Sequence, residues 1–256
     1  MTKSDTSWGN VAGWYDELLE TSTDSYQKNV ILLNIIRLLK LKKGTRILDL
    51  ACGQGFFARE FAGLGANVTG IDASRDLIEI ARKRSPKSIS YHVASADAIG
   101  NIPEQSYDAI VIILALQNIK NIGGVFAQCR RVLARSGRLI IVLNHPAFRI
   151  PKRSSWGWDD GAKTQYRRID SYLTEAQIAI DMHPGAKKKQ TTISFHRPLQ
   201  TYVNMLAKYD FAIMRMEEWI SHKQSDYGPR QIAENRSRKE IPLFLMIEAR
   251  VLPEFS

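Results

Sequence analysis

Cysteine and long apolar runs are both scarce in this 256-residue sequence. Its two cysteines, Cys52 and Cys129, are too few for a disulfide framework and favour a reducing, cytoplasmic setting. The longest apolar run, 109–116, is far shorter than the ~20 residues that a membrane-spanning helix needs. Residues 1–10 are polar and lack the apolar core of a signal peptide. We therefore expect a cytoplasmic protein without a membrane span.

Basic side chains are in excess but are not concentrated. The chain has 36 Lys and Arg against 26 Asp and Glu, a net charge of +10, and such a surplus is typical of proteins with anionic partners such as nucleic acid. However, residues 1–148 and residues 149–256 each contain 18 basic and 13 acidic side chains, so no basic tail is present. A nucleic-acid partner is open but not favoured, and the sequence does not indicate an oligomeric state. The spacing of cysteine and histidine gives no metal-binding motif.

Strand and helix patterns alternate along much of the chain. Strands are expected at 46–50, 66–71, 88–94, 107–114 and 137–143, with helices at 56–64, 74–84 and 123–134 between them. This alternation is typical of a doubly wound α/β sheet. Before it, residues 1–43 are expected to form a helical cap, with helices at 11–20 and 24–41. After it, a helix at 199–209 and strands at 211–217 and 242–251, separated by a polar loop, predict an antiparallel edge pair.

An irregular stretch follows the fifth expected strand. It runs from 144 to 190 and contains two tryptophans, several arginines and three prolines. It is too long for an ordinary connection, and long irregular segments in compact domains are often lids or binding loops. We expect a single domain over 1–256 with residues 144–198 inserted as a substrate lid.

A glycine loop follows the first expected strand, in the sequence I-L-D-L-A-C-G-Q-G. Gly53 and Gly55 allow a tight turn and let a ligand approach backbone amides at a helix start. The pattern also fits a dinucleotide fingerprint. Asp49 argues against that alternative, because its carboxylate would repel a pyrophosphate at the loop but would attract a positive amino group.

Two more carboxylates follow the second and third expected strands. Asp72, in G-I-D-A-S, is placed to accept hydrogen bonds from both ribose hydroxyls of an adenosine. Asp97 is a candidate acceptor for the exocyclic amine of adenine, and the backbone N–H of Ala98 is a candidate donor to a ring nitrogen. Together with Asp49, these residues favour an adenosine cofactor that carries an amino group.

These motifs, followed by A-D-A-I-G-N-I-P-E-Q-S-Y-D-A-I, resemble in order and spacing those of class I S-adenosylmethionine-dependent methyltransferases, of the group that includes the ubiquinone and menaquinone biosynthesis methyltransferases. The resemblance covers roughly residues 10–145. It implies a mostly parallel seven-stranded sheet in the order 3-2-1-4-5-7-6, with strand 7 antiparallel. It also implies S-adenosylmethionine as cofactor and S-adenosylhomocysteine as product. Phe57 lies two residues after Gly55 and no third glycine follows, a departure that the family tolerates.

The resemblance also implies which residues contact the cofactor. The triplet Trp14-Tyr15-Asp16 resembles the aromatic–aspartate pair that precedes the fold in many such enzymes. Tyr15 would then lie over the methionine moiety, unless it only packs the first helix on the sheet. The expected cofactor-binding residues are Tyr15, Asp49, Ala51, Gly53, Gly55, Asp72, Ala73, Asp97, Ala98 and Gln117.

The methyl acceptor is expected beyond the carboxyl ends of the strands. Methyl transfer from a sulfonium is an in-line displacement that depends on orientation and desolvation, and it needs a base only when the acceptor must lose a proton. His145 is the candidate general base, or else it only bonds the turn before Pro146. Aromatic and arginine side chains of the lid suit a flat or anionic acceptor, or form the lid's own core. The expected substrate-binding residues are Asn144, Arg149, Trp156, Tyr166, His196 and Arg197.

Four functions are consistent with the sequence. The favoured one is S-adenosylmethionine-dependent methyl transfer to a small molecule. The net charge of +10 leaves methylation of RNA, such as tRNA, as an alternative. A protein that binds the cofactor without catalysis is another, and the intact motifs argue mildly against it. A nicotinamide-dependent oxidoreductase is disfavoured by Asp49 and the Asp97 region. The sequence does not identify the acceptor or the atom that is methylated.

Overall fold

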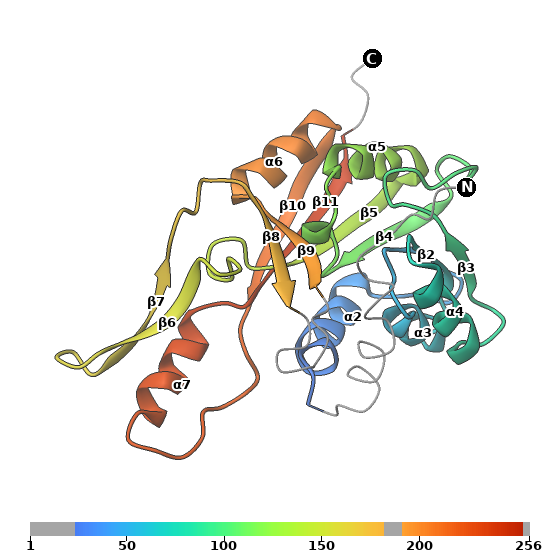
Figure 1. Ribbon diagram of the computed structural model, residues 1–256. Coiled ribbons are helices and arrows are strands. Elements are labelled where there is room, and N and C mark those ends of the chain that lie inside the picture. Colours follow the sequence, from blue (N-terminus) through green and yellow to red (C-terminus); the bar gives the residue numbers. More distant parts are fainter. Residues whose placement is uncertain (1–23, 182–190, 253–256) are drawn as a thin grey trace.

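The computed structural model describes residues 24–181 and 191–252 (Figure 1). Helices and strands alternate along most of this length, as the sequence predicts. In chain order the elements are η2 (Gln27–Leu32), α2 (Leu33–Leu39), β1 (Arg46–Leu50), α3 (Phe56–Gly63), β2 (Asn67–Asp72), α4 (Arg75–Arg84), β3 (Ser90–Val93), β4 (Tyr107–Ile113), η3 (Leu116–Asn118), α5 (Ile122–Val132), β5 (Leu133–Asn144), β6 (Ser154–Asp159), β7 (Thr164–Ile169), β8 (Ala176–Asp181), β9 (Thr191–His196), α6 (Leu199–Lys208), β10 (Phe211–Trp219), α7 (Gln231–Glu240) and β11 (Phe244–Val251). No described helix is long and apolar enough to cross a membrane. The expected helix at 11–20 lies outside the described residues.

The central sheet has seven strands in the order β10-β11-β5-β4-β1-β2-β3. The strands from β5 to β3 are parallel, and β11 runs antiparallel to both of its neighbours, β5 and β10. Counting β10 and β11 as strands six and seven, this is the order 3-2-1-4-5-7-6 with strand seven antiparallel. The doubly wound fold and the antiparallel edge pair predicted from the sequence are therefore confirmed.

Both faces of the sheet are buried, because successive side chains of a strand point to opposite faces. Ile47 of β1 packs in a core with Ile35 of α2 and with side chains of α3 and α4. The next residue, Leu48, packs in a second core with Phe126 of α5 and with side chains of α6. The two helical layers leave the carboxyl ends of β1, β2 and β4 as the edge at which a ligand can bind.

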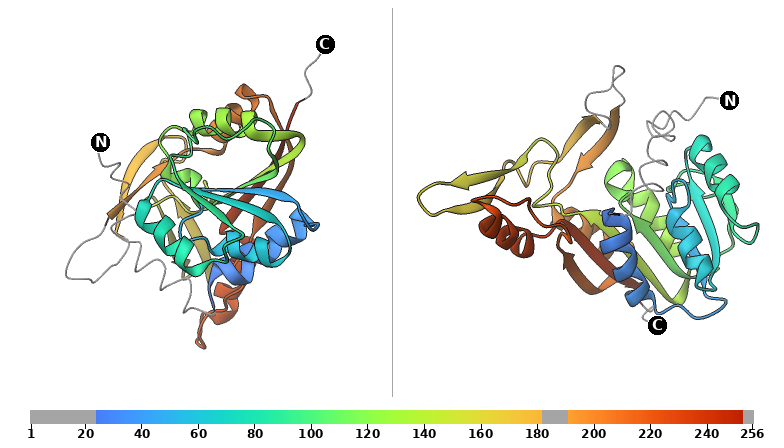
Figure 2. Two further views of the ribbon diagram at one scale, coloured as in Figure 1. Left: turned by 90° about the vertical axis from the view of Figure 1, so that its right-hand side faces the viewer. Right: turned by 90° about the horizontal axis from the view of Figure 1, so that it is seen from below.

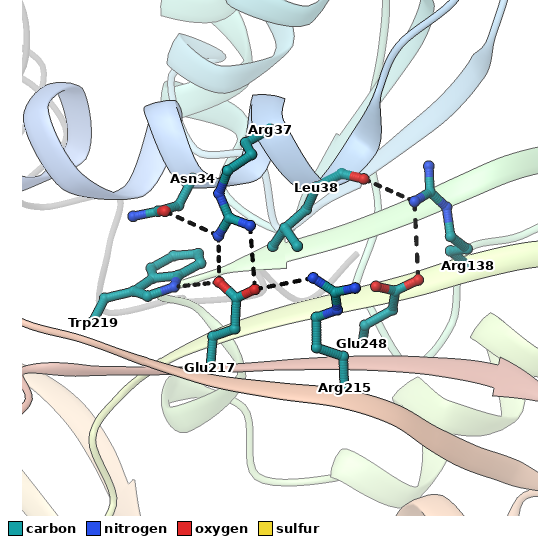
Figure 3. A network of polar contacts seen from close by, with 8 residues as sticks. All are labelled: Asn34, Arg37, Leu38, Arg138, Arg215, Glu217, Trp219 and Glu248. Carbon is teal, nitrogen blue, oxygen red and sulfur yellow. Dashed lines mark hydrogen bonds and ion pairs between the residues drawn. The ribbon is translucent and has the colours of Figure 1, made fainter.

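Polar contacts hold the N-terminal helix α2 on the edge of the sheet (Figure 3). Arg138 of β5 donates to the carbonyl of Leu38, at the end of α2, at 2.9 Å, and lies 3.9 Å from the buried carboxylate of Glu248 on β11. Arg37 on the exposed side of α2 pairs with Glu217 of β10. The cap that the sequence predicts at residues 1–43 is thus attached to β5, β10 and β11 over its described part.

The inserted stretch folds into two antiparallel hairpins, β6–β7 and β8–β9, where the sequence analysis expects irregular structure. The first hairpin packs on α7 and projects from the body with it (Figures 1 and 2), and we call β6, β7 and α7 the arm. In the arm, Ser237 Oγ donates to the carbonyl of Gln165 at 2.9 Å, and the Arg230 guanidinium lies 4.5 Å from the centre of the Trp158 ring. The second hairpin contacts η3, at the ligand-binding edge of the sheet.

Helix α7 was also missed. The sequence analysis expects a polar loop before the last strand, but residues 231–240 of that loop form α7. Its only buried side chain is that of Ser237, so it has no apolar stripe of the kind by which helices are recognised in a sequence.

Candidate active site

A cavity of about 630 Å³ opens at the carboxyl ends of β1, β2 and β4. Residues from the first half of the chain, between Asp49 and Asn121, form most of its lining, and three residues of the β8–β9 hairpin complete it. A cavity of this size is typical of small-molecule and cofactor sites.

The glycine loop gives the cavity its floor because it turns sharply between β1 and α3. Gly53 and Gly55 have φ angles of +58° and +80°, in the left-handed region that glycine adopts without strain. Gly55 is also held close to Tyr91, since a Cβ at this position would lie 2.4 Å from the Tyr91 hydroxyl oxygen. A side chain at Gly55 would therefore displace either the loop or strand β3.

Asp72 is fixed by the backbone of the same loop. Its Oδ2 accepts a hydrogen bond from the Gly53 N–H at 2.9 Å, and its Oδ1 accepts one from the Ser74 N–H at 2.8 Å. Burial raises the pKa of Asp72 although these backbone donors stabilise the charged form. The carboxylate lines the cavity in a fixed orientation, as a group that accepts hydrogen bonds from a ribose must.

Asp49 is the most deeply buried acid of the cavity, with 2% of its surface exposed. Burial, and then the charge of Asp72, raise its pKa to about 7. Its Oδ2 has no hydrogen-bond partner among the described residues. A buried carboxylate oxygen without a partner is costly unless a ligand supplies a donor. The residues present therefore fit a ligand that brings a positive amino group to Asp49.

Asp97 links the third strand to helix α5. One carboxylate oxygen accepts from the Ser95 hydroxyl, and the other accepts from the Asn121 side-chain amide at 2.9 Å. Asn121 also caps α5 by accepting from the Gly124 N–H at 3.0 Å. Asp97 is on the cavity lining, but the N–H of Ala98 already donates to the Ser95 carbonyl at 2.9 Å. A contact of this amide with an adenine ring remains a prediction.

The predicted cofactor residues fall into two groups. Those that line the cavity are Asp49, Ala51, Gly53, Asp72, Ala73 and Asp97. Gly55 is not on the lining but allows the turn of the glycine loop. Gln117 is buried, and its side-chain amide donates to the Leu114 carbonyl at 2.7 Å. Gln117 is not on the lining, and its neighbour Asn118 is. Tyr15 lies outside the described residues.

His145, the candidate base, is not on the lining of this cavity. It is buried, its Nε2 lies 2.7 Å from a carboxylate oxygen of Glu218, and its Nδ1 accepts from the N–H groups of Ala147 and Phe148. Burial lowers the pKa of His145 more than Glu218 raises it. Both ring nitrogens thus have protein partners, an arrangement that fits the turn-forming role weighed for this residue. Catalysis by His145 remains a prediction.

None of the six predicted substrate residues lies on the lining of this cavity. Asn144 accepts a hydrogen bond from Arg149 at 2.8 Å, and the Arg149 guanidinium lies over the ring of Phe244. Trp156 and Tyr166 belong to the arm. The Arg167 guanidinium lies over the Trp156 ring, and the Tyr166 ring lies against Gly157 of the facing strand. The aromatics of the first hairpin therefore pack within the arm.

Sequence reasoning missed every lining residue of the second hairpin, besides several in the first half of the chain such as Asn118. Gln177 of β8 and Ile193 and Phe195 of β9 line the cavity. Residues Gln177 and Phe195 are paired across the two strands, and both also line a second cavity of about 660 Å³. The predicted substrate residues His196 and Arg197 line only that second cavity. Alternation of Ile193 and Phe195 with polar residues was the available signal for this strand.

Metal chemistry has no candidate site in the described part of the chain, where no group of three or more His, Cys, Asp or Glu side chains is placed to hold an ion. The acids of the cavity are instead distributed over separate strand ends, as in a site for an extended organic ligand.

Comparison with known proteins agrees with this geometry. Residues 48–141 match the methyltransferase domain family. A demethylmenaquinone methyltransferase of Tropheryma whipplei is 35% identical over 113 residues, which cover 43% of this chain and 46% of that relative. A ubiquinone biosynthesis O-methyltransferase of Xanthomonas oryzae pv. oryzae is 29% identical over 136 residues, which cover 50% of this chain and 54% of that relative. The chain thus spans about half the length of these curated relatives.

A solved structure matches over a greater length. The crystal structure of an S-adenosylmethionine-dependent methyltransferase from Mesorhizobium loti superposes with a TM-score of 0.68 and 27% identity. The match covers 87% of this chain and 98% of that one. The sequence resemblance and the fold therefore indicate the same family.

Proposed function

This chain carries a methyltransferase domain of the class I, S-adenosylmethionine-dependent kind, and from that premise we propose that the protein transfers a methyl group from S-adenosylmethionine to a small-molecule acceptor. The observation that carries the proposal is the unpartnered, buried carboxylate oxygen of Asp49 in a cavity that also presents Asp72 and Asp97. Three acids at three strand ends match the amino group, the ribose and the adenine amine of this cofactor.

The residues of the cavity have distinct tasks in this proposal. When bound, S-adenosylmethionine supplies a methyl group that is already activated by the sulfonium charge. Asp49 holds the amino group, Asp72 accepts from the ribose hydroxyls, and Asp97 accepts from the adenine amine. Apolar side chains of the lining, such as Ile113 and Leu114, exclude water from the reacting centre. Orientation and desolvation of this kind are the main requirements of an in-line displacement.

The acceptor is proposed to be a small molecule, with a quinone-like or phenolic ring as the first class to test. Two relatives are named for demethylmenaquinone and for ubiquinone biosynthesis. The lining of the cavity beyond the three acids is largely apolar, which suits such a ring. No specific contact favours an RNA acceptor, and we do not propose one.

The proposal is tested by calorimetric titration of the purified protein with S-adenosylhomocysteine and, separately, with NADH. We expect S-adenosylhomocysteine alone to bind. Asp72→Asn should weaken that binding at least tenfold, because a charge-assisted hydrogen bond to a buried carboxylate is worth about 1.5–3 kcal/mol. The matched control is Asp226→Asn, which changes an exposed aspartate and should leave affinity unaltered. Folded protein that does not bind S-adenosylhomocysteine would refute the proposal.

Activity is then measured as transfer of label from methyl-labelled S-adenosylmethionine to a panel of phenols and hydroquinones. Label should appear in at least one acceptor, and Asp72→Asn should abolish it. Binding of cofactor without transfer to any small molecule, together with transfer to RNA, would replace the proposed acceptor class.

A further inference from the structure

One cross-strand pair of the second hairpin lines the cavity outside the cofactor motifs. Gln177 and Phe195 face each other in the register of β8 and β9, and both line the first and the second cavity. They therefore lie at the boundary between the two cavities.

Phe195 is held in place from one side. The Arg197 guanidinium lies over its ring, 5.1 Å from the ring centre. Arg197 is itself buried, and its Nη2 donates to the carbonyls of Ile119 at 2.9 Å and Lys120 at 2.8 Å. Ile119 and Lys120 also line the first cavity. Arg197 thus fastens Phe195 of the second hairpin to the loop that follows β4.

The Phe195 ring is suited to stacking where it lines the first cavity. Arg197, whose guanidinium lies over the ring, lines the second cavity and not the first, whereas Phe195 lines both. A cation on one face of a ring withdraws the negative charge of its π system. The opposite face then favours an electron-rich planar partner, such as a phenol or hydroquinone, in an offset stack.

Gln177 supplies a polar group beside this ring. Its side chain forms no hydrogen bond with any described residue, and its amide is both a donor and an acceptor. Within the described lining it is the polar side chain of the second hairpin, whose other contributions, Ile193 and Phe195, are apolar. A ring stacked on Phe195 can therefore present a hydroxyl group to Gln177.

We infer that Phe195 is the stacking platform for the methyl acceptor, that Gln177 bonds a polar substituent of the acceptor, and that Arg197 positions the platform. The inference rests on the proposed function and deepens it by assigning acceptor selection to the β8–β9 hairpin. The acceptor that fits is a planar, electron-rich aromatic alcohol.

The test uses the full chain saturated with S-adenosylhomocysteine and two probes of similar size, 2-naphthol and its saturated counterpart decahydro-2-naphthol. Binding is measured by calorimetry. Phe195→Leu should weaken the binding of 2-naphthol by about threefold to tenfold. This is the effect expected from the free energy that a pair of aromatic rings gains in addition to burial of apolar surface. It should change the affinity for decahydro-2-naphthol by less than twofold, because leucine keeps the apolar contact. Phe195→Tyr should retain the affinity for 2-naphthol.

Two further variants separate the roles of the neighbours. Gln177→Met, which keeps the length and loses the amide, should weaken both alcohols. Arg197→Met should weaken 2-naphthol but leave the affinity for S-adenosylhomocysteine within twofold, and Arg197→Lys should recover part of the loss because it restores the cation. The control is Tyr227→Leu, at an aromatic residue that is 97% exposed on the arm side of the molecule.

The outcomes are distinct. If S-adenosylhomocysteine binds but 2-naphthol does not bind the wild type, or binds it and Phe195→Leu equally, the stacking platform is refuted and the proposed function stands. An equal loss of both alcohols in Phe195→Leu would also refute stacking, since it would mean loss of shape alone. If S-adenosylhomocysteine itself does not bind, the proposed function fails, and the acceptor inference fails with it.

Discussion

Asp49, which is buried, and Asp72, which is half-buried, lie at the carboxyl ends of adjacent parallel strands, and the charge of Asp72 adds to burial in raising the pKa of Asp49 to about 7. The two acids differ in their partners. Asp72 is bonded by the N–H groups of Gly53 and Ser74, whereas one oxygen of Asp49 has no partner among the described residues. The site is thus fixed at Asp72 and open to a donor at Asp49.

Cofactor affinity should depend on pH through Asp49. In the free protein this carboxyl is about half protonated near pH 7, and an amino group that carries a positive charge requires the ionised form. The affinity for S-adenosylhomocysteine should therefore rise from pH 6 to pH 7.5, by up to about tenfold per pH unit below the pKa. Titrations at pH 6.0, 6.8 and 7.5 measure this. Asp49→Asn should bind weakly with a flat profile, and a flat profile in the wild type would contradict the assignment.

Stability of the ligand-free protein should show the opposite dependence on pH. Folding raises the pKa of the Asp49 carboxyl from near 3.9 in the unfolded state to about 7. Between these two values the carboxyl is protonated in the folded state and ionised in the unfolded state. The contribution of this protonated carboxyl to the free energy of unfolding is present at low pH and is lost as the pH rises toward 7. Asp49→Asn should therefore raise the Tm more at pH 8 than at pH 4.5. Each kcal/mol by which the substitution increases the free energy of unfolding should raise the Tm by roughly 2–4 °C. Equal shifts at both pH values would count against a raised pKa.

Replacement of His145 distinguishes a base from a residue that forms a turn. Asn at this position keeps an acceptor for the N–H groups of Ala147 and Phe148 and loses the contact with Glu218 and the ring contact with Phe148. We expect His145→Asn to lower stability by about 1–2 kcal/mol and to lower kcat less than tenfold. Loss of a general base costs about 100-fold to 10,000-fold, so a loss of that size would establish the catalytic role. His92→Asn, at an exposed histidine of β3, is the matched control.

The contacts between α2 and the sheet should differ in strength according to burial. Removing the guanidinium in Arg138→Met leaves the buried Glu248 without its cation and the end of α2 without a donor, at a cost of about 3 kcal/mol. Arg37→Met removes an exposed pair with Glu217 and should cost less than about 1 kcal/mol. Chemical denaturation of both variants gives the comparison. Equal costs would mean that burial of Glu248 does not determine the strength of this contact.

The parallel core could be predicted because its signals are local. The apolar run at 109–113 of β4 and the glycines between β1 and α3 identify a buried strand and a ligand loop without any tertiary information. The positions of Asp49 and Asp72 follow from the same rule, since Asp72 ends β2 and Asp49 is the last but one residue of β1. The family resemblance added the strand order, which the sequence pattern alone does not determine.

The acceptor side could not be predicted in the same way. Trp156 and Tyr166 were favoured for their residue type, yet each packs within the arm. Phe195 has the same chemistry and lines the cavity, but only the docking of its hairpin on η3 places it there. Which of two hairpins faces a ligand is decided by contacts distant in sequence. Helix α7 was missed for a related reason, because it buries only Ser237 and so lacks an apolar period.

The split origin of the cavity lining bears on how such a protein can change its substrate. The three acids come from residues before 100, and the second hairpin, which supplies Gln177, Ile193 and Phe195, is a separate two-stranded sheet joined to the core through η3 and Arg197. Its side chains can be altered without shifting a single strand of the seven. One lineage can therefore retain its methyl donor while it acquires new acceptors, and exchange of the hairpin between relatives becomes a direct route to engineered selectivity.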